Sequence, residues 1–149
     1  MKCLVSIALF LTAAAPSAFA QHNCPQGFQY AGTLSGTGGY EEFNERVELL
    51  LPEGATIDTT YQQPSVRSRD GNKAAKSDLR AANIPKGIHI IPHGLTDYQK
   101  GWAVSAPKLE QVQGRYKFGM KLYCTTGGGT VANMGGCAVD VEVCYMVKK

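Results

Sequence analysis

The chain has 149 residues, of which 44% are hydrophobic and 18% are charged, and its formal net charge is +3 at neutral pH. This length suits one domain, and a charge so close to zero does not indicate a nucleic-acid partner. Beyond residue 20, no run approaches the roughly 20 apolar residues that a membrane-spanning helix needs, so we expect no transmembrane segment.

Residues 1–20 have the pattern of a secretory signal peptide. Lys2 supplies a charged start, residues 5–15 an apolar stretch, and the Ala-Phe-Ala of residues 18–20 the small-residue pattern that precedes a cleavage site. Cleavage there removes one basic residue and leaves a net charge of +2 on a single mature domain, residues 21–149. A short, alanine-rich leader is typical of bacteria, so we expect a periplasmic or secreted bacterial protein.

Short apolar runs, each bounded by Gly, Pro, Asn or Asp, predict strands along the mature chain. Residues 43–51 alternate between apolar and polar side chains and stop at the Pro-Glu-Gly of residues 52–54, although a helix is the alternative there. Residues 72–83 have a spacing that predicts one short helix, which ends before Pro85. Weaker strands are predicted at residues 28–34, 56–61, 87–91 and 102–106.

The clearest two-residue alternation lies near the C-terminus. Every second residue from Tyr116 to Cys124 is apolar, and the same pattern recurs from Val139 to Val147. We expect these two strands to pair as an antiparallel hairpin joined by the glycine-rich residues 125–136. Seven strands and one short helix then predict an all-β fold, a disulfide-stabilised antiparallel β-sandwich or jelly roll.

Four cysteines follow the leader, and export favours structural disulfides over a catalytic or metal-binding role. If Cys137 and Cys144 lie on a single strand, seven residues apart, they point to opposite faces and cannot bond to each other, which leaves two of the three pairings. We favour a bridge between Cys124 and Cys137, at the two ends of the glycine-rich connection. Cys24 then pairs with Cys144. The alternative pairs Cys24 with Cys137 and Cys124 with Cys144.

His89, His93 and Asp97 form a string of zinc-ligand types at intervals of four residues. On a helix this spacing would place all three on one face, but the β-branched neighbours of His89 and the proline beside His93 predict a strand followed by a turn. A metal centre then requires the side chains to converge in space. It is the alternative, and no cofactor is expected.

The densest charge lies in residues 67–86, which hold six basic and two acidic side chains. Point charges on such a loop suit an acidic protein surface, a lipid A phosphate or an anionic polysaccharide, and a solvated, partly disordered insertion is the alternative. Aromatic side chains beside predicted turns often anchor partners. The candidate binding residues are therefore Arg67, Arg69, Lys73, Lys76, Tyr98 and Tyr40.

No catalytic or ligand-binding motif in the sequence rises above chance matches. We expect a non-catalytic exported binding protein of the inhibitor, immunity or adhesion/toxin-subunit type, which recognises a macromolecule through residues 67–86, 93–102 and 125–136. One alternative is a small metal-dependent or hydrolytic secreted enzyme that uses the two histidines and the aspartate named above. The other is a self-assembling envelope protein.

Overall fold

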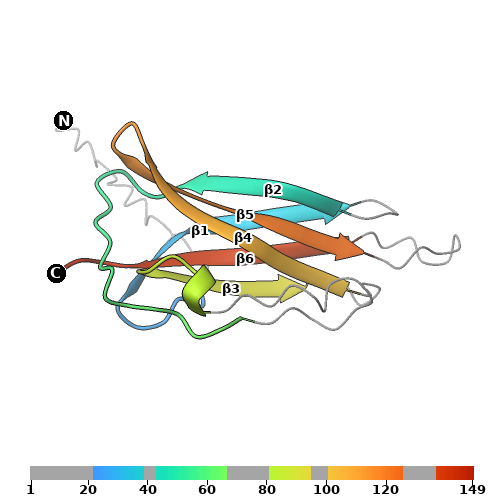
Figure 1. The fold of residues 1–149 in the computed structure, drawn as a ribbon, viewed down its shortest axis with the longest axis horizontal. Coiled ribbons are helices and arrows are strands. Elements are labelled where there is room, and N and C mark those ends of the chain that lie inside the picture. The colour runs from blue at the N-terminus through green and yellow to red at the C-terminus, as the bar shows by residue number, and fades with distance from the viewer. Residues whose placement is uncertain (1–21, 39–42, 67–80, 95–100, 126–136) are drawn as a thin grey trace, which may run out of the picture.

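The computed structural model describes residues 22–38, 43–66, 81–94, 101–125 and 137–149, and these residues form two three-stranded antiparallel sheets (Figure 1). The first sheet has the order β1 (Phe28–Gly38), β6 (Cys137–Met146) and β3 (Ile88–Gly94). The second has the order β2 (Phe43–Leu50), β5 (Arg115–Thr125) and β4 (Gly101–Val112). The all-β sandwich predicted from the sequence is confirmed.

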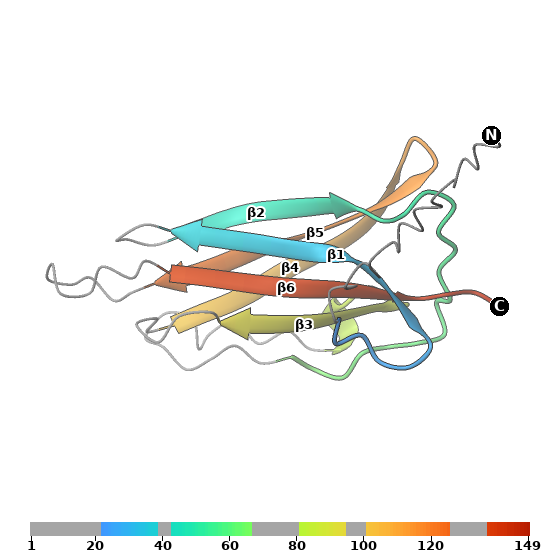
Figure 2. The ribbon, with the colours of Figure 1, turned by 180° about the vertical axis from the view of Figure 1, so that it is seen from behind.

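The two sheets pack face to face around one apolar core, as the opposite views in Figures 1 and 2 show. At the centre, Phe118, Met120 and Leu122 of β5 are fully buried. Val139, Val141 and Val143 of β6 are fully buried in the same cluster. The two-residue alternation in both strands therefore marks the face that each sheet turns toward the other.

The predicted hairpin between the last two strands is wrong. β5 and β6 belong to different sheets, and β5 instead pairs with β2 and β4. Packed sheets lie about 10 Å apart, a distance that the connection of residues 126–136 is long enough to cross. β4 reaches β5 through a two-residue turn at Gln113 and Gly114, both with positive φ, as a tight hairpin requires.

The sequence also predicts one strand more than the described residues form. Residues 56–61 make a single bridge, between Ile57 and Val147, because the chain there crosses the end of the first sheet instead of joining its edge. Of the helix predicted at residues 72–83, the described part is a 3₁₀ turn, Ala81–Asn83, and the remainder lies outside the described residues.

Strand β4 runs six residues past its predicted end at Ala106. The register shifts between Ser105 and Lys108, so the chain bulges where Pro107 lacks a backbone donor. Ala106 takes a φ of 47° in this bulge. A proline in the sequence therefore interrupts the pairing of an edge strand without ending it.

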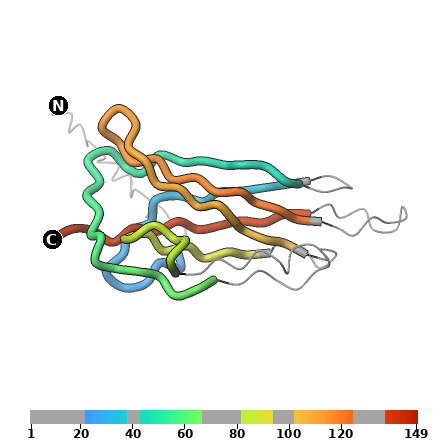
Figure 3. The backbone as a smooth tube through the Cα atoms, viewed as in Figure 1, coloured from blue at the N-terminus to red at the C-terminus, as the bar shows by residue number. Residues whose placement is uncertain are grey.

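The chain after β2 covers the free edge of β3 (Figure 3). Gln63, 5% exposed, donates from Nε2 to the Ile90 carbonyl at 2.7 Å, and its Oε1 accepts from the Ile90 N–H at 2.8 Å. This side-chain amide satisfies the two groups that a neighbouring strand would otherwise pair. It also places the start of the basic stretch beside the middle of β3.

Two disulfides tie the framework in the pairing that the sequence favours. Cys124 of β5 bonds to Cys137 of β6, with 5.7 Å between the Cα atoms, so this bridge joins the two sheets. Cys24 bonds to Cys144 and fixes the N-terminal segment to β6, with a Cα separation of 5.8 Å. Paired disulfides are typical of proteins that fold in an oxidising compartment.

We predict that removing the Cys24–Cys144 bridge lowers stability more than removing the Cys124–Cys137 bridge. The bridges span sequence separations of 120 and 13 residues. Loop closure predicts costs of about 5 and about 3 kcal/mol, respectively. Urea unfolding of the two double Cys→Ser variants measures both free energies. The reverse order would contradict this account.

Candidate functional site

All six candidate binding residues lie outside the described residues: Arg67, Arg69, Lys73, Lys76, Tyr98 and Tyr40. The same holds for Asp97, the third member of the possible metal string. The chain on either side of them is described, so the points at which these segments leave the sandwich are known. His89 and His93 are the predicted site residues for which the structure gives side-chain contacts, beside the four disulfide cysteines.

His89 and His93 lie on one face of β3 but do not form one site. Four residues of extended strand separate their Cα atoms by about 13 Å. His89 Nδ1 lies 2.7 Å from Tyr61 Oη, whereas His93 Nε2 lies 2.9 Å from Glu142 Oε2. Two histidines that share a zinc ion must each bring a nitrogen to about 2 Å from it. Within the described residues, no group of three possible ligands is placed to hold a metal ion.

Glu142 is the centre of a polar cluster on the outer face of the first sheet. Its side chain is 13% exposed, and its carboxylate accepts hydrogen bonds from Asn23 N at 3.3 Å and Asn23 Nδ2 at 2.8 Å. The His93 ring donates a third bond from Nε2. Burial by itself would raise the pKa of Glu142, but these hydrogen bonds hold it below the usual value.

Residues 22–27, the N-terminal strap, provide part of this cluster. The His22 ring stacks on Tyr30 with centroids 3.9 Å apart and an interplanar angle of 9°. Asn23 binds Glu142, and Cys24 is bonded to Cys144. The strap therefore uses the polar and aromatic groups of this face to fix the N-terminal chain, which gives the cluster a structural role.

The other histidine of β3 belongs to an aromatic group. The Phe28 ring meets Tyr61 edge to face, with centroids 4.7 Å apart, and Tyr61 bonds to His89. Partial burial lowers the pKa of His89 and raises the pKa of Tyr61. The His89 imidazole is consequently neutral at neutral pH, and it packs the chain after β2 against the first sheet.

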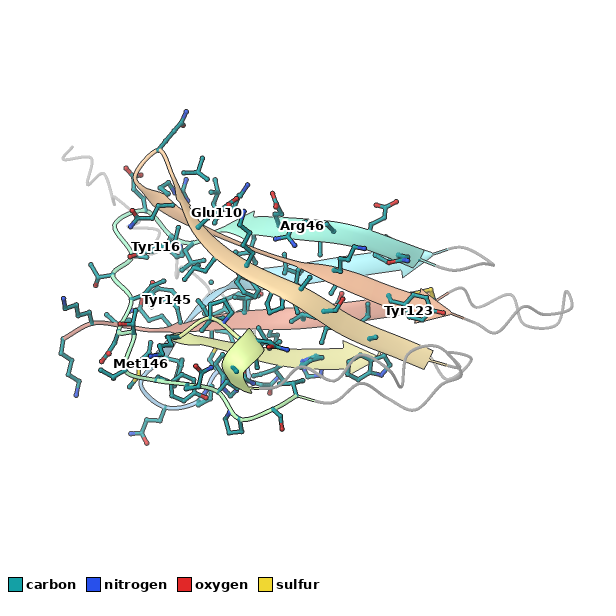
Figure 4. All side chains as sticks on the ribbon, in the orientation of Figure 1. Arg46, Glu110, Tyr116, Tyr123, Tyr145 and Met146 are labelled. Atoms are coloured by element: carbon teal, nitrogen blue, oxygen red, sulfur yellow. A yellow bond between two sulfur atoms is a disulfide. The ribbon has the colours of Figure 1, made fainter. Side chains whose placement is uncertain are left out.

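The outer face of the second sheet carries a charge ladder that crosses its three strands, and Figure 4 labels Arg46 and Glu110 in it. Lys117 of β5 lies at its centre, with Nζ 2.8 Å from Glu110 Oε1 and 3.1 Å from Glu48 Oε2. Lys108 extends the ladder on β4 and Arg46 on β2, at 2.6 Å and 3.2 Å from these glutamates. Hydrogen bonds from Lys108 and Lys117 lower the pKa of Glu110 to about 2.

A glycine makes room for the ladder. A Cβ on Gly119 would lie 2.7 Å from Glu48 Cγ and 3.1 Å from Arg46 Nη2. Because Gly119 has no side chain, Arg46 passes over β5 and donates from Nη1 to the Ala106 carbonyl on β4 at 3.0 Å. The β4 bulge therefore supplies the acceptor that fixes the guanidinium.

One end of the sandwich, here called the disulfide end, gathers the strand ends of both sheets around the Cys124–Cys137 bridge. In the first sheet, the ends of β1 and β3 lie opposite the start of β6, with Gly38 facing Cys137. In the second, β2 and β4 begin where β5 ends. Four connections pass between the sheets, and three of them, residues 39–42, 95–100 and 126–136, leave from this end (Figures 1 and 3). The fourth, residues 51–87, leaves β2 at the opposite end, where Leu50 faces Lys117.

Comparison with protein families, curated proteins and solved structures finds no match for this chain. In the described ranges, no helix is long and apolar enough to cross a membrane.

Neither polar cluster follows from the sequence. The alternation along β5 and β6 puts Lys117 and Glu142 on the polar side of each strand, but their partners come from segments whose position the alternation does not predict. The pairs Arg46/Glu48 and Lys108/Glu110 put opposite charges two residues apart, and this repeated spacing is the signal that predicts a charged sheet face.

We predict that Glu110 stays ionised to unusually low pH. Nuclear magnetic resonance titration of its side-chain carboxyl should give a midpoint near 2, the pKa that its two lysine partners produce. Lys117→Gln should move the midpoint toward 4.5, whereas Lys86→Gln, away from the ladder, should not. A wild-type midpoint at the ordinary value would contradict the ladder geometry.

We also predict a specific contribution of Glu142 to acid unfolding. Folding lowers its pKa, so the carboxylate stabilises the fold above the usual value of 4.5, and this contribution is lost as pH falls through the folded-state pKa. Glu142→Gln removes the titration, so between about pH 6 and pH 3 its unfolding free energy should fall less steeply than that of the wild type. Glu53→Gln, on the exposed turn after β2, is the control, and equal slopes for wild type and Glu142→Gln would refute the prediction.

Proposed function

We propose that this chain is an exported, non-catalytic binding protein that recognises a macromolecular partner at the disulfide end of the sandwich. The observation that carries the proposal is that three of the four sheet-crossing connections leave the sandwich at that end. Two of these connections contain Tyr40 and Tyr98, the aromatic residues that the sequence suggests as anchors. Connections clustered at one end of a rigid sandwich are a common site of recognition.

Rigidity at the disulfide end supports this proposal. The Cys124–Cys137 bridge holds the last residues of β5 and the first of β6 together across the core. Both cysteines are buried, with exposed fractions of 0% and 2%. A fixed base limits the conformational entropy that the connections lose when a partner binds, and that loss is one of the main costs of association.

The contacts of the histidines favour a binding role over a catalytic one. His93 donates to a carboxylate that Asn23 also binds, and His89 bonds to a tyrosine in an aromatic group. Both imidazoles thus hold chain segments together. The wide separation of the two histidines on β3 also weighs against the metal-dependent enzyme that the sequence offers as an alternative.

The basic stretch leaves the sandwich at a different place. Gln63, just before it, pairs with Ile90 in the middle of β3, and Gln62 donates to the carbonyl of Ile84, near its last residues. We therefore propose that this stretch attracts the partner electrostatically from the side of the sandwich. The contact with the partner itself forms at the disulfide end. The leader pattern and the two disulfides support a periplasmic or secreted location.

A capture experiment with matched variants tests the proposal. Tagged protein is used to capture its partner from the envelope fraction and culture medium of the source cells. Tyr40→Ala with Tyr98→Ala should lower capture at both low and physiological salt, because aromatic anchors contribute through burial. The triple variant Arg67→Ala, Arg69→Ala and Lys73→Ala should lower it only at low salt.

The control is Lys148→Ala with Lys149→Ala, because the C-terminus follows β6 at the opposite end of the sandwich. Undiminished capture by the tyrosine variant would place the contact surface elsewhere. Metal analysis of protein purified without a histidine tag tests the enzyme alternative, and a stoichiometric content of zinc or copper would favour that alternative over the proposal.

A further inference from the structure

One row of the second sheet places two cations directly opposite each other on its outer face. Arg46 of β2 is the cross-strand partner of Lys121 of β5, and Lys121 is paired on its other side with Ser105 of β4. Like charges in direct cross-strand positions repel each other and destabilise a sheet. An anion bound between the two side chains would relieve this repulsion.

The Arg46 guanidinium is fixed in place before any ligand arrives. Its Nε donates to Glu48 Oε1 at 3.2 Å, and its Nη1 donates to the Ala106 carbonyl at 3.0 Å. These bonds fix the guanidinium through Nε and Nη1, and its third nitrogen, Nη2, lies over Gly119 without a hydrogen bond to any described residue. A planar donor group that is already oriented loses little entropy when it binds an oxyanion.

Lys121 differs from the other lysines of this face. Lys108 and Lys117 bond to the ladder glutamates, whereas Lys121 is exposed and makes no ion pair with any described residue. Around Gly119, this face carries four cations, Arg46, Lys108, Lys117 and Lys121, against two carboxylates, Glu48 and Glu110. The excess positive charge therefore lies in the row of Arg46 and Lys121.

We propose that Arg46, Lys121 and Ser105 form an oxyanion site that binds the sulfate or carboxylate groups of an acidic polysaccharide. The guanidinium and the ammonium hold the anion between them, and the Ser105 hydroxyl lies in the same row as a further donor. The site is on the face of the second sheet, away from the disulfide end, so it does not depend on the proposed function.

The surroundings of the row favour a polysaccharide over a protein. The centres of protein interfaces are depleted of lysine and glutamate, yet this face is built from both. They also favour a polysaccharide over a lipid surface, where apolar side chains insert beside the cations. Among the described residues, the large exposed apolar side chains are Leu50 and Val112. Leu50 is paired with Lys117, about 13 Å along β5 from Lys121.

Binding to dextran sulfate, with neutral dextran as the blank, tests the site at about 50 mM salt, where exposed ion pairs are weakly screened. All proteins carry the triple substitution Arg67→Ala, Arg69→Ala and Lys73→Ala, so that the basic stretch does not dominate binding. Lys121→Gln should raise the dissociation constant about fivefold, the effect of one exposed ion pair. Lys149→Gln, which removes the same charge at the exposed C-terminus, should leave it unchanged.

A stability measurement separates loss of binding from loss of folding. Lys121→Gln removes one member of a repelling pair, so urea unfolding should show stability equal to or above that of the parent protein. Polygalacturonate in place of dextran sulfate distinguishes carboxylate from sulfate recognition, and binding to either supports the site.

Equal losses for Lys121→Gln and Lys149→Gln would reduce the effect to overall charge and overturn the proposal. Binding to phosphatidylglycerol vesicles without binding to either polysaccharide would also overturn it, in favour of a lipid surface. The tyrosine substitutions at the disulfide end should leave dextran sulfate binding unchanged, so failure of this site and failure of the proposed function are distinguishable.

Discussion

The mutual burial of β5 and β6 is the contact on which the rest of this molecule depends. Their inward side chains are fully buried in one cluster, and the Cys124–Cys137 bridge joins the same two strands at one end. Each of these strands is also the central strand of its sheet. Every edge strand is therefore held in position by a central strand that the core and the disulfide already fix. For the same reason, the strand ends at the disulfide end are rigid.

The two outer faces of the sandwich stabilise their charged side chains in different ways. On the first sheet, the N-terminal strap covers Glu142 and brings it hydrogen bonds, so a carboxylate with little exposure stays ionised. On the second, side chains from three strands neutralise one another in the charge ladder while they remain in contact with water. The Arg46 and Lys121 row is the place where this neutralisation is incomplete, and that imbalance is the reason to expect an anionic ligand there.

The edges follow the same principle of satisfying polar groups locally. The Gln63 amide pairs with Ile90 on the free edge of β3, and a bulge with Pro107 interrupts the edge strand β4. Both devices block the addition of another strand. They favour a discrete binding protein over the self-assembling envelope protein that remains an alternative from the sequence.

The sequence by itself determined the strand class and the buried faces of the last two strands, because residue alternation is a local property of an extended chain. It favoured the observed disulfide pairing but left one alternative open, which the structure excludes. It did not determine that β5 and β6 lie in different sheets, since alternation reveals which side of a strand is buried and not which strand lies beside it. The Glu142 cluster, the charge ladder and the Arg46 and Lys121 row join residues far apart in the chain. Only the tertiary structure decided them, because strand order and register bring those side chains together.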